Sequence, residues 1–230
     1  AIFGLSGNIM AQNSSCVSSI TRWWQDFGTG TVNTSHPDVP GSVNYVAGTT
    51  SLLNGNQYRI STNTQQAPGW HNAPDHTGNA DGRMLVMNGS AGTFLTHETT
   101  LTTPLTPGFY IISAYVMNLY TAQACAPLGF LPQLSFSAEY QLSNGSWVHF
   151  INSPANSSAV QASSNPQWEN LWNSLEVPAN IPANVTKVRI SISNLTPAGC
   201  GNFFAIDDIH FAFCSDGGPL PVNFLDITAS

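Results

Sequence analysis

The chain has 230 residues, long enough to bury a substantial core, and only 7% of them are charged. Twelve Asp and Glu stand against five Lys and Arg, a formal net charge of −7, so no basic patch for nucleic acid can be assembled. Hydrophobic residues make up 42% of the chain, which excludes disorder, and no run of about 18 apolar residues could span a membrane. The polar surface must therefore consist mainly of Ser, Thr, Asn and Gln, as in many secreted β-rich proteins.

The first twelve residues differ in character from the rest. The run AIFGLSGNIMAQ is apolar and ends in small residues, like the end of a signal peptide, although no basic segment precedes it. We expect residues 1–12 to be a signal-peptide remnant or the edge of the expressed segment; the alternative is a genuine N-terminal strand. Under either interpretation we expect an exported protein.

Two polar, glycine-containing segments follow. WWQDFGTG (23–30) contains Asp26. In DHTGNADG (75–82), oxygen donors stand at every second position: Asp75, Thr77, Asn79 and Asp81. The second segment is not an EF-hand, because its aspartates and glycine are out of register and no Glu stands at the twelfth position. A surface loop is the simplest interpretation, and a cation-binding loop is the alternative.

The middle of the chain has the patterns of strands. GFYIISAYVMNLY (108–120) is apolar at both odd and even positions, which predicts a strand covered on both faces. LPQLSFSAEYQL (131–142) alternates instead, and Asn144-Gly145 then predicts a tight hairpin turn. The residues expected on its apolar face are Leu134, Phe136, Ala138 and Tyr140, and those on its polar face are Ser135, Ser137, Glu139 and Gln141.

Two more strands complete the predicted domain. VTKVRISISNL (185–195) alternates, with Val188, Ile190 and Ile192 inward and Lys187, Arg189 and Ser191 outward. In NFFAIDDIHFAFC (202–214) the odd positions are expected to face the core. Many short strands separated by turn signals predict an all-β sandwich. We place this sandwich at residues 13–214, and 215–230 as a linker and the start of a following module or an extra strand.

Asp207 stands on the predicted core face of the last strand. A buried carboxylate is very costly unless it is paired, hydrogen-bonded or bound to a metal, and five basic residues offer few partners. Ca²⁺ with oxygen ligands would resolve the problem. Asp208, Asp26 and the donors of residues 75–82 are the candidate companions. The alternative is that Asp207 accepts hydrogen bonds from backbone N–H groups.

Four cysteines support an exported protein. Cys16, Cys125, Cys200 and Cys214 show no CxxC spacing, which argues against zinc, and an even number in a secreted chain predicts two disulfides with three possible connectivities. Two of them lie near the ends of the domain, and the other two follow strong strands. We favour the pairs Cys16–Cys214 and Cys125–Cys200.

Catalysis has little support in the sequence. No GxSxG, P-loop or GxGxxG motif occurs, and His71, His76 and His97 lack the spacing of a zinc site. We therefore expect no enzyme. Three tryptophans lie in polar or loop-like contexts, where an exposed ring could stack on a sugar, although most tryptophans are core residues. They are Trp70, Trp147 and Trp172.

Four segments together resemble a recurring jelly-roll domain of cell-surface and secreted proteins from gliding, type IX-secreting bacteria. They are WWQDFGTG, WHNAPDHTGNADGRMLVMNG, GFYIISAYVMNL and FAIDDIHFAFC. The last is also similar to the end of MAM domains and of calcium-containing jelly-roll carbohydrate-binding modules. LPVNFLDITA resembles the opening of the module that often follows in type IX cargo proteins. The resemblance covers roughly residues 20–228 of the chain.

The resemblance implies a jelly-roll sandwich in which Asp207 or Asp208 is a structural calcium ligand, with aspartates of WWQDFG and DHTGNADG as companions. The sugar-contacting residues of the binding modules do not map onto this chain. We therefore expect a non-catalytic extracellular module that binds a glycan or acts as an adhesin. Two alternatives are a surface-fibre subunit that assembles by strand addition through residues 1–12 or 219–228, and an accessory domain of a glycan-active enzyme.

Overall fold

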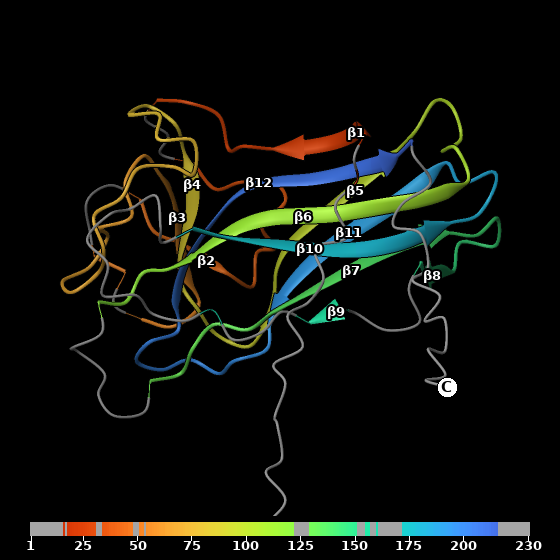
Figure 1. The fold of residues 1–230 in the computed structure, drawn as a ribbon. Coiled ribbons are helices and arrows are strands. Elements are labelled where there is room, and N and C mark those ends of the chain that lie inside the picture. Colours follow the sequence, from red (N-terminus) through yellow and green to blue (C-terminus); the bar gives the residue numbers. More distant parts are fainter. Residues whose placement is uncertain are drawn as a thin grey trace, which may run out of the picture.

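Two β-sheets make up the part of the chain that the computed structural model describes (Figure 1). The described residues are 16, 18–30, 34–47, 51–52, 54–121, 129–150, 155–156, 160 and 172–215, with only the backbone described at 155–156 and 172–179. No helix occurs within these ranges, so the predicted all-β fold is confirmed, and nothing helical there could cross a bilayer. Residues 1–12 and 216–230 lie outside the described residues.

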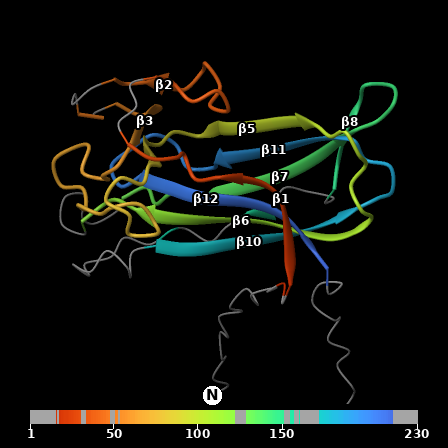
Figure 2. The same cartoon turned by 90° about the horizontal axis from the view of Figure 1, so that it is seen from above.

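The two sheets stack as the layers of a jelly-roll sandwich, as Figure 2 shows from above. The larger sheet has the order β10-β6-β12-β4-β3-β2, and β1 also pairs with β12. Its strands are β1 (Ser19–Gln25), β2 (Asn44–Tyr45), β3 (Gln57–Ser61), β4 (Met84–Asn88), β6 (Gly108–Asn118), β10 (Trp172–Ile181) and β12 (Phe203–Cys214). The smaller sheet has the order β5-β11-β7-β8, with β9 also on β7. Its strands are β5 (Gly92–Thr100), β7 (Leu134–Gln141), β8 (Trp147–His149), β9 (Ala155–Asn156) and β11 (Lys187–Asn194).

Regular alternation along β7 and β11 separates the two faces of the smaller sheet. Side chains in a strand point alternately to opposite faces, so every second residue enters the core. Six residues expected to face inward are buried: Leu134, Phe136, Ala138, Val188, Ile190 and Ile192. Tyr140, also expected inward, is half-buried and packs against the core, and Ser135, expected on the polar face, is buried. Burying each large apolar side chain stabilises the fold by about 1.5–3 kcal/mol. The hairpin at Asn144-Gly145 is also confirmed, since it leads from β7 into its neighbour β8.

Strand β6 is apolar at both parities because both of its faces are covered. Ile112 and Val116 lie in the core between the sheets. On the opposite face Met117 packs in a second cluster with Trp70, and Ile111 packs in a third cluster beside Cys214. The predicted strand with two buried faces is therefore confirmed.

Strand β12 contains a β-bulge that the sequence pattern did not reveal. Its register with β6 shifts between Asp207 and His210, and Asp208 has a left-handed φ of 46°. On its other edge, β12 pairs with β4 as far as Ile206 and with β1 from Ile209 onward. The bulge therefore lies where one neighbouring strand ends and the other begins.

The bulge corrects the predicted orientation of β12. An extra residue in a strand reverses which parity faces the core. Before the bulge Phe204 and Ile206 lie in the core between the sheets, and after it Ile209 and Phe211 do. The expectation that odd positions face this core throughout is wrong, because residues 203 and 205 pack in the second cluster instead. Asp207 is buried as predicted, but on the outer side of the sheet.

A disulfide joins Cys16 to Cys214, the first of the two favoured pairs. It ties the start of β1 to the end of β12, where Ser19 is paired with Cys214. Cys200 is also disulfide-bonded, and Cys125, its predicted partner, lies outside the described residues. Linking β1 to β12 restricts the unfolded chain and so stabilises the sandwich.

Candidate functional site

Buried carboxylates gather at the bulge of β12. Asp207 is 1% exposed and Asp208 7%, and Asp75, on the loop before β4, is buried as well. The loop that contains Asp75 contacts the segment that follows β1, since Gly30 N donates a hydrogen bond to the Asp81 carbonyl oxygen at 2.7 Å. The segment 23–30 and the loop 75–82 therefore lie side by side, and a bridge between Thr29 and Gly82 adds to this contact.

Backbone N–H groups satisfy Asp207. Its Oδ1 accepts a hydrogen bond from Asp208 N at 2.8 Å, and its Oδ2 accepts one from His76 N at 3.1 Å. Asp208 contacts the Nδ1 atom of His76 at 2.7 Å and the indole Nε1 of Trp24 at 3.3 Å. The His76 ring stacks on Tyr115. This is the backbone-bonded arrangement that the sequence analysis left as the alternative to a metal.

The Asp207 carboxyl group is electrostatically unfavourable when ionised. Burial raises its pKa from 3.8 to about 8, and the charge of Asp208 adds to the rise. The hydrogen bonds from His76 N and Asp208 N lower the pKa but do not offset the burial, and Asp75 raises it further. Without a nearby cation, Asp207 is therefore mostly protonated at neutral pH.

The predicted calcium ligands are only partly brought together. Asp75 accepts hydrogen bonds from Asn79 N at 2.7 Å and Thr77 Oγ1 at 2.8 Å, while Asp26 accepts one from Gly28 N at 2.9 Å. Asp81 is exposed. No group of three or more His, Cys, Asp or Glu side chains within the described ranges is arranged to hold a metal ion. Carboxylate oxygens that already accept one hydrogen bond keep a second lone pair, so calcium stays a prediction.

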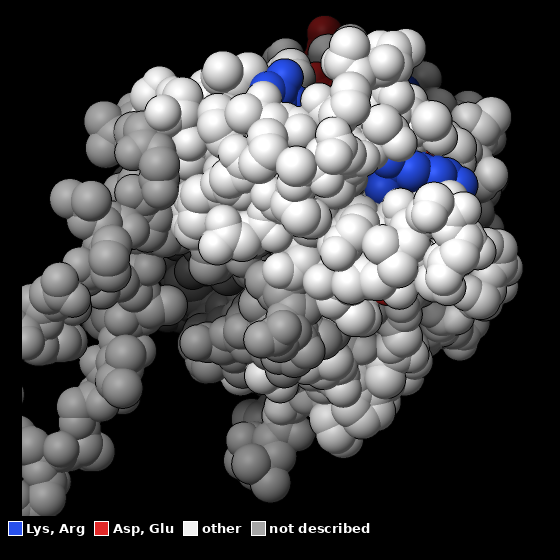
Figure 3. Space-filling view, turned by 90° about the vertical axis from the view of Figure 1, so that its right-hand side faces the viewer, with Lys and Arg blue, Asp and Glu red and all other residues white. Residues whose placement is uncertain are grey.

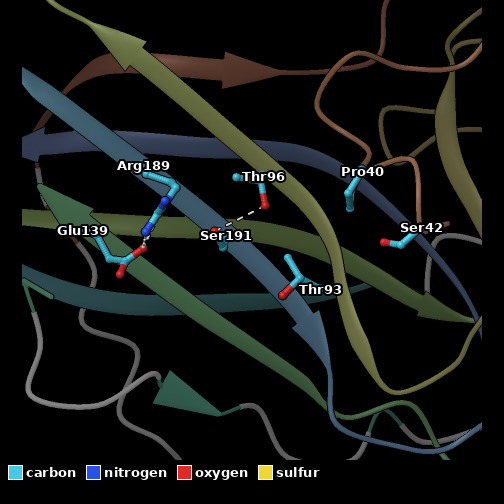
Figure 4. A pocket seen from close by; sticks show the side chains of 7 residues that line it. All are labelled: Pro40, Ser42, Thr93, Thr96, Glu139, Arg189 and Ser191. Carbon is cyan, nitrogen blue, oxygen red and sulfur yellow. Dashed lines mark hydrogen bonds and ion pairs between the residues drawn. The ribbon is translucent and has the colours of Figure 1, made fainter. Parts of the chain in front are cut away.

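The outer face of the smaller sheet holds a pocket of about 360 Å³ (Figure 4). Its volume lies in the range of small-molecule binding sites. Hydroxyl groups from β5 and β11 line it, and two residues before β2 form its rim. The lining residues are Pro40, Ser42, Thr93, Thr96, Glu139, Arg189 and Ser191.

An ion pair crosses this face from β11 to β7. Arg189 and Glu139 are paired in register, and Glu139 Oε2 accepts hydrogen bonds from Arg189 Nε at 2.8 Å and from Arg189 Nη2 at 2.7 Å. The Arg189 guanidinium lies 4.2 Å from the centre of the Trp147 ring, and Lys187 Nζ lies 5.4 Å from it. Cation–π contacts of this kind hold the indole in one position on the sheet.

More polar groups extend along the same face. Lys187 Nζ pairs with Glu98 at 2.6 Å, and His149 Nε2 lies 3.6 Å from the second oxygen of Glu139. Both ion pairs between Lys or Arg and an acid in the described residues are therefore here. Figure 3 shows one end of the sandwich, where few atoms of charged side chains are visible. Glu98, Glu139, Lys187 and Arg189 thus lie together on the outer face of the smaller sheet.

The three candidate tryptophans have different environments. Trp147 is half-buried on the outer face of the smaller sheet. Trp70 is 4% exposed and packs against Phe203, so it is not available to stack on a ligand. The backbone of Trp172 lies in β10, but its side chain is outside the described residues.

The sequence analysis missed the part that Arg189 and Glu139 play in a site. Glu139 was interpreted as part of an ordinary polar face. Both residues belong to the correctly predicted outward sets of two alternating strands, so their orientation could be anticipated. What the sequence lacks is the register that places β11 beside β7 and brings the two charges opposite each other.

No protein-family model and no curated protein matches the chain. Among solved structures, it is similar to the CBM22-1 xylan-binding domain of Paenibacillus barcinonensis Xyn10C, with 12% identity, 86% of this chain and 96% of that domain covered, and a TM-score of 0.43. The C-terminal family 22 carbohydrate-binding module of Clostridium thermocellum Xyn10B has 12% identity, coverages of 69% and 82%, and a TM-score of 0.40. A cellulose-specific CBM28 module has 11% identity, coverages of 76% and 86%, and a TM-score of 0.37.

At these identities and TM-scores the similarities carry no argument about what this chain binds. The fold described above rests on the strand pairings of the chain itself. The function has to be inferred from the side chains of its own surface.

The titration of Asp207 predicts how stability changes with pH in metal-free buffer. An acid with a folded-state pKa raised to about 8 binds more protons in the folded state between pH 4 and 8. Its contribution to the unfolding free energy is fully present below pH 4 and is lost as pH rises from 4 through 8, by at most about 6 kcal/mol. Asp207→Asn should remove this loss, as measured by urea unfolding at several pH values.

Asp81→Asn is the matched control, because Asp81 is an exposed acid in the same corner. It should leave the pH dependence of the wild type unchanged. An Asp207→Asn variant whose unfolding free energy falls with pH as steeply as that of the wild type would contradict the assignment.

Proposed function

We propose that the protein is a non-catalytic glycan-binding module and that the outer face of β5, β11, β7 and β8 is its binding surface. The observation that carries the proposal is the pocket of about 360 Å³ bounded by hydroxyl groups and the Arg189–Glu139 pair. Trp147 contacts the same arginine. Sugars present hydroxyl groups around an apolar ring face, and this surface offers partners for both.

The Arg189–Glu139 pair suits a binding role. A guanidinium donates to sugar oxygens, and a carboxylate accepts hydrogen bonds from sugar hydroxyls. Both charged groups are held in place, since each hydrogen-bonds to the other across neighbouring strands. Preorganised side chains reduce the entropy lost on binding. Because Glu139 is used as the partner of Arg189, we propose binding rather than hydrolysis.

The disulfide supports a location outside the cytoplasm. Disulfides persist in oxidising compartments, and the Cys16–Cys214 bond links the segment before β1 to the end of β12. We propose that the protein works in the extracellular space or at a cell surface, as part of an adhesin or a secreted glycan-binding protein exported by type IX secretion.

Replacing Trp147 should weaken glycan binding. We expect Trp147→Ala to lower the affinity for the best-bound oligosaccharide of a glycan array at least about tenfold, about 1.4 kcal/mol, because stacking and the positioning of Arg189 are both lost. Isothermal titration calorimetry would measure the change.

Trp24→Ala is the control, since Trp24 is 54% exposed on β1 of the larger sheet. It should bind as the wild type does. Equal loss in both variants, or binding that survives Trp147→Ala unchanged, would refute the proposed surface, provided that circular dichroism shows both variants folded.

We also propose that calcium stabilises the corner at the β12 bulge. The support is the burial of Asp75, Asp207 and Asp208 with only His76 as a described ion-pair partner. A bound cation would favour the ionised form of Asp207 and remove the cost of burying it. The predicted donors are Asp26, Asp75, Thr77, Asn79, Asp81, Asp207 and Asp208; at least three of them would have to move closer together to hold the ion, since no three acids are so arranged in the described residues.

Chelation is expected to lower the melting temperature. Removing an ion present at about 100 times its Kd costs about 2.7 kcal/mol, or about 5–10 °C for a domain of this size. EGTA in magnesium-containing buffer should produce the shift and added Ca²⁺ should reverse it. An unchanged melting temperature, with no calcium found by elemental analysis, would eliminate the ion.

A second candidate function rests on the free edge of β1. In the described residues β1 pairs only with β12, and Ile20 is 47% exposed. Such an edge can accept a strand from a neighbouring molecule, as in a surface fibre. Arg22 and the bulge between Thr21 and Trp23 limit this pairing.

The fibre hypothesis is open to a strand-addition test. Ile20→Lys should abolish assembly seen by light scattering if β1 accepts a strand, because the lysine adds charge at the edge. Deleting residues 1–12 should do the same if these residues donate the strand. A protein that is monomeric at all concentrations before either change would rule the fibre out.

A further inference from the structure

A second, smaller pocket lies under the segment that precedes β2. Its volume is about 110 Å³, well below that of most small-molecule sites. It therefore suits a single chemical group rather than a sugar ring. The residues that line it are Phe27, Thr34, Ser35, His36, Pro37, Ile60 and Arg83.

The guanidinium of Arg83 lines this pocket without a partner among the described residues. Its Nε is buried and has no hydrogen bond, and no ion pair or side-chain hydrogen bond joins Arg83 to the described part of the chain. A partly buried cation without an acceptor is costly, because desolvation is not repaid. No acceptor among the described residues therefore accounts for the position of this guanidinium.

The other four basic residues all have partners. Lys187 pairs with Glu98, and Arg189 pairs with Glu139. Arg59 donates to Val46 O at 2.9 Å and to the side chain of Gln66. Burial raises the pKa of Tyr110, and the charge of Arg22 opposes that rise, which places Arg22 beside this hydroxyl. Among the five Lys and Arg, Arg83 is thus the exception as far as the described residues go.

The backbone around Arg83 is shaped to hold the side chain. Arg83 N donates to Gly28 O at 3.0 Å, and a Cβ at Gly28 would clash with Nη2 of Arg83. Gly28 also has a φ of 77°, which other residues rarely adopt. The neighbouring Phe27 has a φ of 54°, an uncommon conformation for a bulky residue. A strained loop therefore places the guanidinium at this pocket.

We propose that the Arg83 pocket binds an oxyanion group, either a sulfate or a carboxylate. A guanidinium offers N–H donors in a planar fork that matches two oxygens of such a group. Two hydroxyl residues, Thr34 and Ser35, line the same pocket. The proposal does not depend on glycan binding by the smaller sheet.

His36 adds a neutral donor to this pocket. Its Nδ1 accepts a hydrogen bond from Asp38 N at 3.2 Å, so the ring proton is on Nε2. Burial lowers the pKa of His36; the Asp38 charge opposes this and the Arg83 charge adds to it. His36, which lines the pocket with Arg83, thus has an N–H donor on Nε2, and Arg83 is the one fixed positive charge of the lining residues. The group that suits this pocket carries one or two negative charges.

The ligand group has two possible sources. It is either a free inorganic anion or an acidic substituent of a glycan, a sulfate ester or a uronate. Both would present the same oxygens to Arg83. A substituent on a sugar would also contact the rim of the pocket, so it should bind more tightly than the free ion.

The test measures binding of sodium sulfate, a monosaccharide sulfate and a uronic acid by calorimetry at constant ionic strength. The variants are Arg83→Met, Arg83→Lys and, as the matched control, Arg22→Met, which changes the net charge equally. We expect Arg83→Met to weaken binding at least tenfold, Arg83→Lys to weaken it several-fold and Arg22→Met to leave it unchanged.

The outcomes separate the possibilities. Tighter binding of a sugar acid than of inorganic sulfate, lost in Arg83→Met, supports a glycan substituent; equal binding supports a free anion. If Arg83→Met does not fold, weakened binding by Arg83→Lys supports the site. Wild-type protein that binds none of the three probes, or Arg83 variants that bind as Arg22→Met does, would overturn the proposal.

Discussion

The bulge of β12 is the constraint on which the larger sheet depends. Strand β12 pairs with β6 along one edge and with β4 and then β1 along the other. An extra residue at Asp207–Asp208 reverses the strand's parity, so that Phe204 and Phe211 can both enter the core. The same irregularity leaves two adjacent carboxylates buried at the junction. The change of parity along β12 and the cost of burying Asp207 and Asp208 therefore both arise from the bulge.

The two sheets have different outer surfaces, and this difference decides where a ligand can bind. Loops and apolar clusters cover much of the outer face of the larger sheet, with Trp70 and Met117 buried there. The outer face of the smaller sheet remains polar, because polar and apolar residues alternate along β7 and β11. The Arg189–Glu139 ion pair lies on that face, in a chain of which only 7% of the residues are charged. The binding surface follows from regular strands, and the buried acids follow from an irregular one.

Local patterns in the sequence were sufficient for the all-β fold and for the faces of β6, β7 and β11, since a period of two is visible in any regular strand. They did not predict which residues of β12 face the core, because its bulge depends on a left-handed conformation of Asp208. No sequence pattern indicates that conformation. The Arg189–Glu139 contact joins residues 50 positions apart, so it requires the strand register. The position of Arg83 in a pocket without an acceptor among the described residues likewise depends on contacts distant in sequence. Long-range pairing, rather than residue type, was the missing information.

The central claim is that the outer face of the smaller sheet binds a glycan. An NMR titration of isotope-labelled protein with the best-bound oligosaccharide from a glycan array tests it directly. The account predicts shifted amide signals along β7, β8 and β11, including Glu139 and Arg189, and a shifted indole signal of Trp147. Shifts confined to β1, β6 or β12, or no shift with any soluble glycan, would contradict it.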